Sequence, residues 1–131
     1  MTRLLLITLL FLSSGPAYAE WVVLVDSDSE PIGTVYFDPD SIRRKGDVVK
    51  VWHLFDYKTA PKKAPIPYLS SRGQSEFDCE DERVRRLSER YFPGNMLKGE
   101  QVYWTSDATE WEPVAPGSVG QRMWKVVCNK K

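Results

Sequence analysis

Two cysteines, Cys79 and Cys128, are the residues of this 131-residue chain that most clearly imply chemistry. No third cysteine is present, and the pair lacks the C-x-x-C spacing of a redox motif. In an oxidising compartment an even pair of cysteines usually forms a structural disulfide. We therefore predict one bridge, which closes a long loop and contributes about 4 kcal/mol to stability.

The single histidine, His53, is the natural candidate for a general base. No hydrolase motif such as G-x-S-x-G surrounds it, and it lies in a segment that looks like a strand. Glu76 and Asp78, two residues apart on a strand, only point to the same side. Because a nucleophile, a base and an orienting group cannot be assembled, we predict that the protein is not an enzyme and uses no cofactor.

An acidic string, Asp26-Ser27-Asp28-Ser29-Glu30, matches the opening of a calcium-binding loop. Such a loop needs Gly at its sixth place and Glu at its twelfth, where this chain has Pro31 and Phe37. A solvated turn is the preferred interpretation. A zinc site is also disfavoured, because only one histidine accompanies the cysteines, so no metal site is predicted.

Arginines concentrate in one segment, where they could contact a partner. The candidates are Arg83, Arg85, Arg86 and Arg90, with Arg43, Arg44 and Lys45 as additional members. Acidic residues dilute this charge, so a solvated face of mixed charge is the alternative. They are Glu80, Asp81, Glu82 and Glu89.

A second candidate surface is the segment 58–67, which carries three prolines and the lysines Lys58, Lys62 and Lys63. Its proline content excludes helix and sheet, so we expect an exposed loop. Loops on a rigid scaffold often carry recognition, but they are also simply variable. A binding role and a passive role both remain open.

An export signal precedes the elements that position these residues. Arg3 is followed by the apolar run 4–12, Pro16 ends that run, and Ala17-Tyr18-Ala19 fits a signal peptidase site. The run is shorter than the roughly 20 residues that span a bilayer. We predict a signal peptide at 1–19 and one domain at 20–131, periplasmic or secreted, without membrane insertion. Glu20, not Cys, follows the cut, so no lipid anchor is expected.

Composition narrows the possible partners. Lys and Arg number 18, and Asp and Glu also number 18, whereas nucleic-acid binding requires a strongly basic face. Five Trp, six Tyr and five Phe are many for this length, and aromatic side chains are enriched in binding surfaces. We therefore expect a protein partner and no nucleic acid.

Turn residues divide the mature chain into short apolar runs that predict strands. These runs are 21–25, 33–37, 48–57, 70–79, 99–106 and 111–114. Residues 37–42 predict a turn or a single helical turn. An amphipathic helix is predicted from Ser118 to Asn129. Its sheet-facing residues would be Val119, Met123, Val126 and Val127.

The segment Arg83 to Tyr91 is ambiguous. Its apolar residues Val84, Leu87 and Tyr91 fit both a helical stripe and a strand with a bulge. Local propensities favour a helix.

Motifs in a fixed order along the mature chain are similar to those of the bacterial surface-adhesin protein E family. They are Trp21, Phe37-Asp38, Ser41-Ile42, Val51-Trp52, Asp56-Tyr57-Lys58, Glu76-Phe77-Asp78-Cys79, Arg83 to Tyr91, Trp111, Pro116-Gly117-Ser118 and Val127-Cys128. The resemblance implies an α+β fold, in which a single antiparallel sheet of about six strands carries a C-terminal helix on one face, held by the Cys79–Cys128 disulfide. It also implies that Arg83 to Tyr91 is a strand, and we adopt this over the local helical preference.

Two functional hypotheses follow. The first, which the resemblance implies, is an exported non-catalytic binding protein that adheres to host or envelope proteins. The second is a structural or accessory periplasmic protein of an envelope assembly. Binding that weakens with salt would favour the first, and isolation only within a fixed complex would favour the second.

Overall fold

The computed structural model describes residues 20–29 and 32–129, so the predicted signal at 1–19 lies outside the described residues. Within these ranges no helix is long and apolar enough to cross a membrane. The strands are β1 (Val22–Ser27), β2 (Gly33–Phe37), β3 (Arg43–Lys45), β4 (Val48–Tyr57), β5 (Ser70–Asp78), β6 (Arg83–Phe92), β7 (Tyr103–Thr105) and β8 (Glu112–Pro113). The helices are the 3-10 turns η3 (Pro39–Ser41) and η4 (Asn95–Leu97) and the α-helix α1 (Val119–Asn129).

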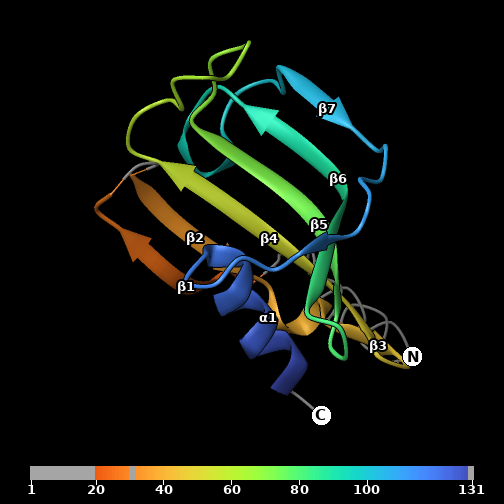
Figure 1. The fold of residues 1–131 in the computed structure, drawn as a ribbon. Coiled ribbons are helices and arrows are strands. Elements are labelled where there is room, and N and C mark those ends of the chain that lie inside the picture. The colour runs from red at the N-terminus through yellow and green to blue at the C-terminus, as the bar shows by residue number, and fades with distance from the viewer. Residues whose placement is uncertain (1–19, 30–31, 130–131) are drawn as a thin grey trace, which may run out of the picture.

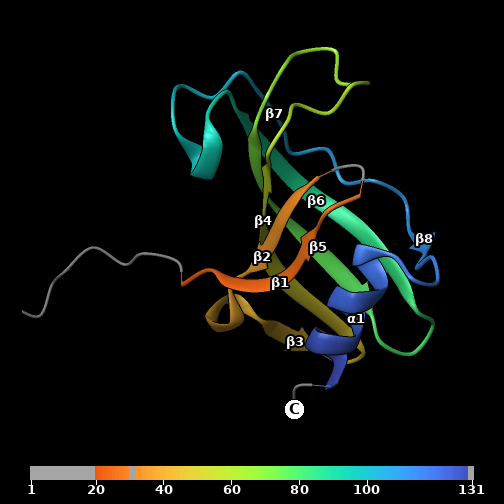
Figure 2. The same cartoon turned by 90° about the vertical axis from the view of Figure 1, so that its left-hand side faces the viewer.

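All strands belong to one antiparallel sheet, shown in Figure 1. Its main path has the order β1-β2-β4-β5-β6-β7, while β3 pairs with β4 and β8 pairs with β6. Figure 2 shows α1 against one side of this sheet. The predicted α+β fold, with about six principal strands and a C-terminal helix, is therefore confirmed.

The core lies between α1 and the sheet, because apolar residues alternate along the strands and recur on one side of the helix. Met123 and Val127 are the buried residues of α1, as predicted, with Val119 and Val126 half-buried beside them. From the sheet the core receives Val35, Phe37, Val49, Val51 and Phe77.

The disulfide between Cys79 and Cys128 fastens the end of α1 to the end of β5, as predicted. Trp124, one turn earlier on the helix, donates a hydrogen bond from Nε1 to the carbonyl of Asp78 at 2.8 Å. Ser118 caps the first turn, since its Oγ accepts from the Gln121 amide at 3.1 Å. Both ends of α1 are thus held, and the helix begins at Val119, one residue later than predicted.

The local helical preference of β6 is wrong, and the strand implied by the family resemblance is confirmed. β6 pairs along its length with β5, which supplies hydrogen-bond partners that no local propensity reports. Its register shifts opposite Gln74 and Ser75, so that Leu87 is the extra residue of a bulge. The bulge reverses the alternation of β6, and Arg86, Glu89 and Tyr91 therefore share the α1 side while Arg85 and Arg90 share the other.

Other boundaries differ from the predictions at the sheet edges. β3 was not predicted, because three consecutive charged residues have no strand periodicity; its hairpin with β4 turns at Gly46, whose φ is +62°. The strands predicted at 99–106 and 111–114 shrink to β7 and β8, which pair with β6 alone. The first strand is shifted to Val22–Ser27. η3 confirms the single helical turn predicted within 37–42.

Candidate functional site

The side of the sheet turned away from α1 carries the predicted arginines, and we call it the outer face. The register of β4, β5 and β6 assigns alternate residues to it. We define it by Lys50, Trp52, Arg72, Glu76, Asp78, Arg83, Arg85 and Arg90, with Trp104 and Trp111 from the edge segments. Three of the four predicted β6 arginines lie here.

Arginine side chains stack on tryptophan rings across this face. The guanidinium carbon of Arg72 lies 5.1 Å from the centre of the Trp52 ring, and that of Arg90 lies 5.5 Å from Trp104. Arg83 and Arg85 both stack on Trp111, at 5.2 and 4.8 Å. Such contacts hold long side chains in place while their charge stays near the surface.

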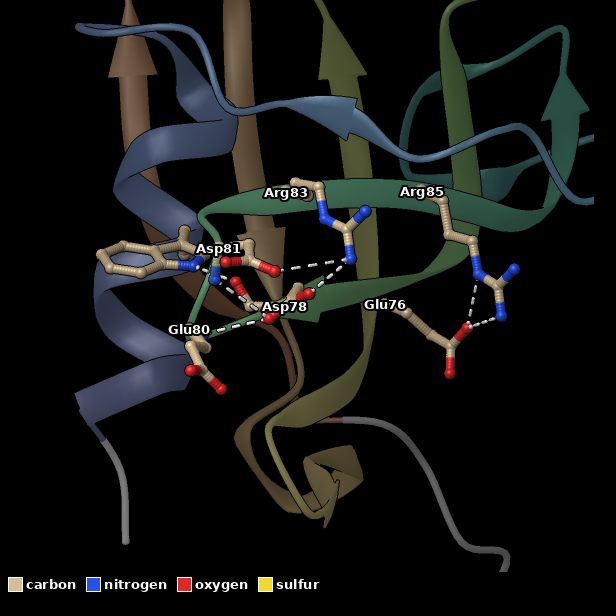
Figure 3. A network of polar contacts seen from close by, with 7 residues as sticks. Glu76, Asp78, Glu80, Asp81, Arg83 and Arg85 are labelled. Atoms are coloured by element: carbon tan, nitrogen blue, oxygen red, sulfur yellow. Dashed lines mark hydrogen bonds and ion pairs between the residues drawn. The ribbon is translucent and has the colours of Figure 1, made fainter.

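Two of these arginines are also neutralised by carboxylates of β5, as Figure 3 shows. Arg83 binds Asp78 and Arg85 binds Glu76, each at 2.7 Å. The hydrogen bond from Arg83, together with the backbone amides of Asp81 and Glu80, lowers the pKa of Asp78. Both charges are therefore balanced within the fold, and a role of Arg83 and Arg85 in binding stays a prediction.

Other cations of the outer face have no such partner. Among the described residues, Lys50, Arg72 and Arg90 form no ion pair; Arg90 donates only to the amide oxygen of Gln101, at 2.8 Å. Asp56, farther along β4, accepts from the Met96 amide of η4 at 2.9 Å. Glu76, Asp78 and Asp56 are therefore engaged, whereas these three cations have no ion-pair partner among the described residues.

A basic hollow of about 370 Å³ adjoins Lys50, one of these cations. One row of paired residues runs across four strands through Arg43, Lys50, Glu76 and Arg85, so β3 extends the arginine surface. The hollow is lined by Arg43, Arg44, Lys45, Val48, Lys50 and Glu76. The predicted additional members on β3 thus lie in the same surface as Arg85.

The opposite end of the outer face is aromatic and exposed. Trp104, on the edge strand β7, lies on this face and is 52% exposed. Its neighbour Tyr103 is equally exposed, but it lines a hollow on the α1 side together with Val102. A large exposed aromatic side chain stacked on an arginine is typical of the centre of a protein interface.

The remaining predicted candidates lie elsewhere. Arg86 points to the α1 side, where it lines a pocket with His53 and Glu89. The lysines Lys58, Lys62 and Lys63 are exposed on the loop between β4 and β5. Residues 64–66 of that loop line a hollow with Tyr91 and Tyr103, on the α1 side rather than on the outer face.

His53 is buried, and its Nε2 lies 2.9 Å from the Ser75 hydroxyl. Burial, with the nearby charge of Arg86, lowers its pKa to about 4. Within residues 20–29 and 32–129 no cluster of three or more potential metal ligands occurs. In the acidic string, Asp26 accepts a hydrogen bond from Thr34 at 2.9 Å, and Glu30 lies outside the described residues.

Sequence reasoning missed several members of the outer face, namely Lys50, Arg72 and the tryptophans that stack on its arginines. The alternation of 48–57 already places Lys50 and Trp52 on one side. Arg72 carried no such signal, because its place beside Arg90 depends on the register between β5 and β6.

The surface-adhesin protein E family model matches residues 21–129 of this chain. No curated protein sequence matches it. Three structures of Haemophilus influenzae protein E share the fold of this chain. Their sequence identities to it are low, so the similarity concerns the fold alone. Crystal form II aligns with a TM-score of 0.58 and 10% identity, covering 84% of this chain and 96% of that chain. The selenomethionine form aligns with a TM-score of 0.61 and 10% identity, covering 88% of this chain and 90% of that chain. Protein E from a non-typeable strain aligns with a TM-score of 0.60 and 12% identity, covering 86% of this chain and 78% of that chain. The chain therefore belongs to the surface-adhesin protein E family.

Proposed function

We propose that this protein is an exported, non-catalytic binding protein that adheres to an acidic surface of a host or envelope protein through its outer face. The observation that carries the proposal is a set of cations that form no ion pair within the described part of the chain and lie beside an exposed tryptophan stacked on an arginine. Lys50, Arg72 and Arg90 supply the charge, and Trp104 supplies apolar contact area.

This chemistry favours a protein partner. Arginine and tryptophan dominate the binding energy of protein interfaces, and charge at the rim sets the rate and salt dependence of association. Through Lys50 the outer face continues into the basic hollow at β3, which can receive carboxylates of the partner. The family name, surface adhesin, agrees with this role.

Catalysis is the alternative that the Ser75–His53 contact raises. A histidine that acts as general base needs a pKa near the working pH, and the pKa of His53 is about 4. Its Nδ1 receives no orienting hydrogen bond from the described residues. A base this weak, without an orienting group, supports binding rather than turnover.

Export is supported by the disulfide, since such bonds persist outside the cytoplasm. The signal at 1–19 and cleavage after Ala19 remain predictions. Intact-mass analysis of the exported protein tests them, and a chain that retains residues 1–19 in the exported fraction would contradict them.

The proposed surface is tested with matched variants of the oxidised, exported protein. The outer-face variant Lys50→Gln/Arg72→Gln/Arg90→Gln removes three cations without breaking an ion pair of the described residues. A loop variant, Lys58→Gln/Lys62→Gln/Lys63→Gln, removes the same charge from the loop between β4 and β5. Proteins captured from envelope and extracellular fractions are then quantified at increasing salt.

We expect the outer-face variant to lose most captured protein and most of the salt dependence. Its melting temperature should change little, because none of the three cations forms an ion pair with a described residue and Gln keeps a polar side chain at the half-buried positions 50 and 72. The loop variant should capture as the unmodified protein does. Equal capture by all three proteins would contradict the proposal. Loss confined to the loop variant would assign binding to the lysine loop.

A further inference from the structure

A second site lies on the α1 side of the sheet, away from the outer face. It is a pocket of about 350 Å³ between β4, β5 and β6 and the first turn of α1. Figure 1 shows that α1 crosses only part of this side and leaves the rest of β5 and β6 uncovered. The volume is at the low end of the range for ligand pockets, which suits a small molecule.

Aromatic rings form one wall of the pocket and continue out of it. Phe55 and Tyr57 stack with centroids 6.2 Å apart, and Tyr57 meets Tyr68 at 5.8 Å. Tyr68 meets Tyr91 edge-on at 4.7 Å, and Tyr91 lies 5.8 Å from the exposed Tyr103. The planar ring of a ligand can stack on such a wall or pack edge-to-face against it.

Arg86 brings a positive charge into this aromatic pocket. Thr109 fixes its backbone with two hydrogen bonds of 2.9 Å, and its pairing with Ser75 places its side chain on the α1 side. Within the part of the chain that the structure describes, its guanidinium forms no ion pair and donates no hydrogen bond, and its Nε is buried. A cation in such surroundings favours an anionic partner.

Glu89, the neighbouring acidic residue, forms no ion pair with Arg86 among the described residues. The Glu89 side chain is buried against Gly73. A Cβ atom at position 73 would lie 2.5 Å from the Oε1 atom of Glu89, so only glycine leaves room for the carboxyl group there. Burial raises the pKa of Glu89 to about 7 despite the neighbouring Arg86. About half of the Glu89 carboxyl groups are therefore uncharged at pH 7, and in those molecules Glu89 does not offset the charge of Arg86.

We propose that this pocket binds a small aromatic carboxylate, with its ring against Tyr68 and Tyr91 and its carboxylate on Arg86. The hydroxyls of Ser71 and Ser75 also line the pocket and add polar atoms to its wall. A guanidinium paired with a carboxylate is among the strongest contacts available to such a ligand. The site is independent of the outer face, since Arg86 and Arg90 lie on opposite sides of β6.

The test uses 2-naphthoate and its neutral counterpart 2-naphthamide, titrated into the oxidised protein by calorimetry and by amide NMR. We expect 2-naphthoate to bind about tenfold or more tightly than 2-naphthamide, because only the acid pairs with the guanidinium. Shifted amides should cluster around Ser71, Ser75 and Tyr91. Equal affinity for the two probes, absence of binding, or shifts confined to another surface would each overturn the proposal.

Variants on the two sides of β6 sharpen the assignment. Arg86→Gln should weaken 2-naphthoate binding about tenfold and leave 2-naphthamide binding unchanged, whereas Arg90→Gln should affect neither probe. Arg86→Lys keeps the cation and should retain most of the affinity, which gives a readout if Arg86→Gln fails to fold. An Arg86→Gln protein that binds 2-naphthoate as the unmodified protein does would refute the site.

Discussion

At the scale of single residues, the two sides of the sheet treat charge differently. On the outer face, carboxylates of β5 neutralise Arg83 and Arg85, and tryptophans support the cations that remain. On the α1 side, burial keeps His53 neutral and shifts Glu89 toward its uncharged form. The outer face is thus suited to a charged macromolecule and the pocket to a small ligand.

The buried groups predict how stability changes with pH. Glu89 has a pKa of about 7 when folded against an ordinary value of 4.5, so the folded state holds a proton that the unfolded state has released between these values. The free energy of unfolding therefore falls as the pH rises through this window. His53, with a folded pKa of about 4 against 6.5, has the opposite effect up to pH 6.5. Above pH 6.5 the contribution of His53 no longer changes, and the free energy of unfolding falls because of Glu89.

Glu89→Gln should remove this decline, because glutamine has no proton to release. Thermal unfolding followed between about pH 6.5 and 8 measures it. The exposed Glu110→Gln serves as the control and should show the same fall in melting temperature as the unmodified protein. A Glu89→Gln protein that keeps the full decline would show that another group titrates in this range.

At the scale of elements, the periodicity of the sequence predicted the strands and the helix whose apolar residues pack into the core. It did not predict the strands that form because a neighbouring strand pairs with them. The strand 48–57 and the helix were predictable, because buried apolar residues alternate in one and recur at helical spacing in the other. β3 and the true extent of β7 depend on neighbouring strands, which no local pattern encodes. For the same reason β6 looked helical alone, and the bulge at Leu87, which puts Arg86 and Arg90 on opposite sides of the sheet, could not be located.

Docking of α1 is tested at Met123, which is 3% exposed in the core. Met123→Asp should unfold or strongly loosen the protein, because it buries an unpaired carboxylate and removes a core side chain. Lys125→Asp, on the exposed side of the same helix, controls for the new charge and should change the melting temperature only slightly. Similar melting temperatures for both variants would show that α1 does not dock through this side.

The bridge between Cys79 and Cys128 should contribute about 2–5 kcal/mol to the free energy of unfolding. Cys128→Ser, compared with the oxidised protein by denaturant titration, measures that contribution. Alkylation without reductant should find no free thiol in the folded exported protein. Labelling of either cysteine under these conditions would contradict a stable bridge.

At the scale of the whole molecule, the fold could be predicted further than the site. The order of the motifs indicated the family, and the family resemblance implied the sheet, the helix and the disulfide. The candidate site needed the register, which separates Arg86 from its neighbours and adds Lys50 and Arg72 to the outer face. It also needed the ion pairs, which show that Arg83 and Arg85 are already balanced.

The central claim, that this protein binds its partner through the outer face, is tested most directly by site-specific photocrosslinking. A photoreactive phenylalanine analogue is placed at Trp104 on the outer face or at Lys125 on the exposed side of α1, and each oxidised protein is irradiated with envelope and extracellular fractions. We predict a discrete protein adduct from position 104, suppressed by high salt and by Lys50→Gln/Arg72→Gln, and none from position 125. Adducts from position 125 alone, or equal adducts from both positions at every salt concentration, would contradict the claim.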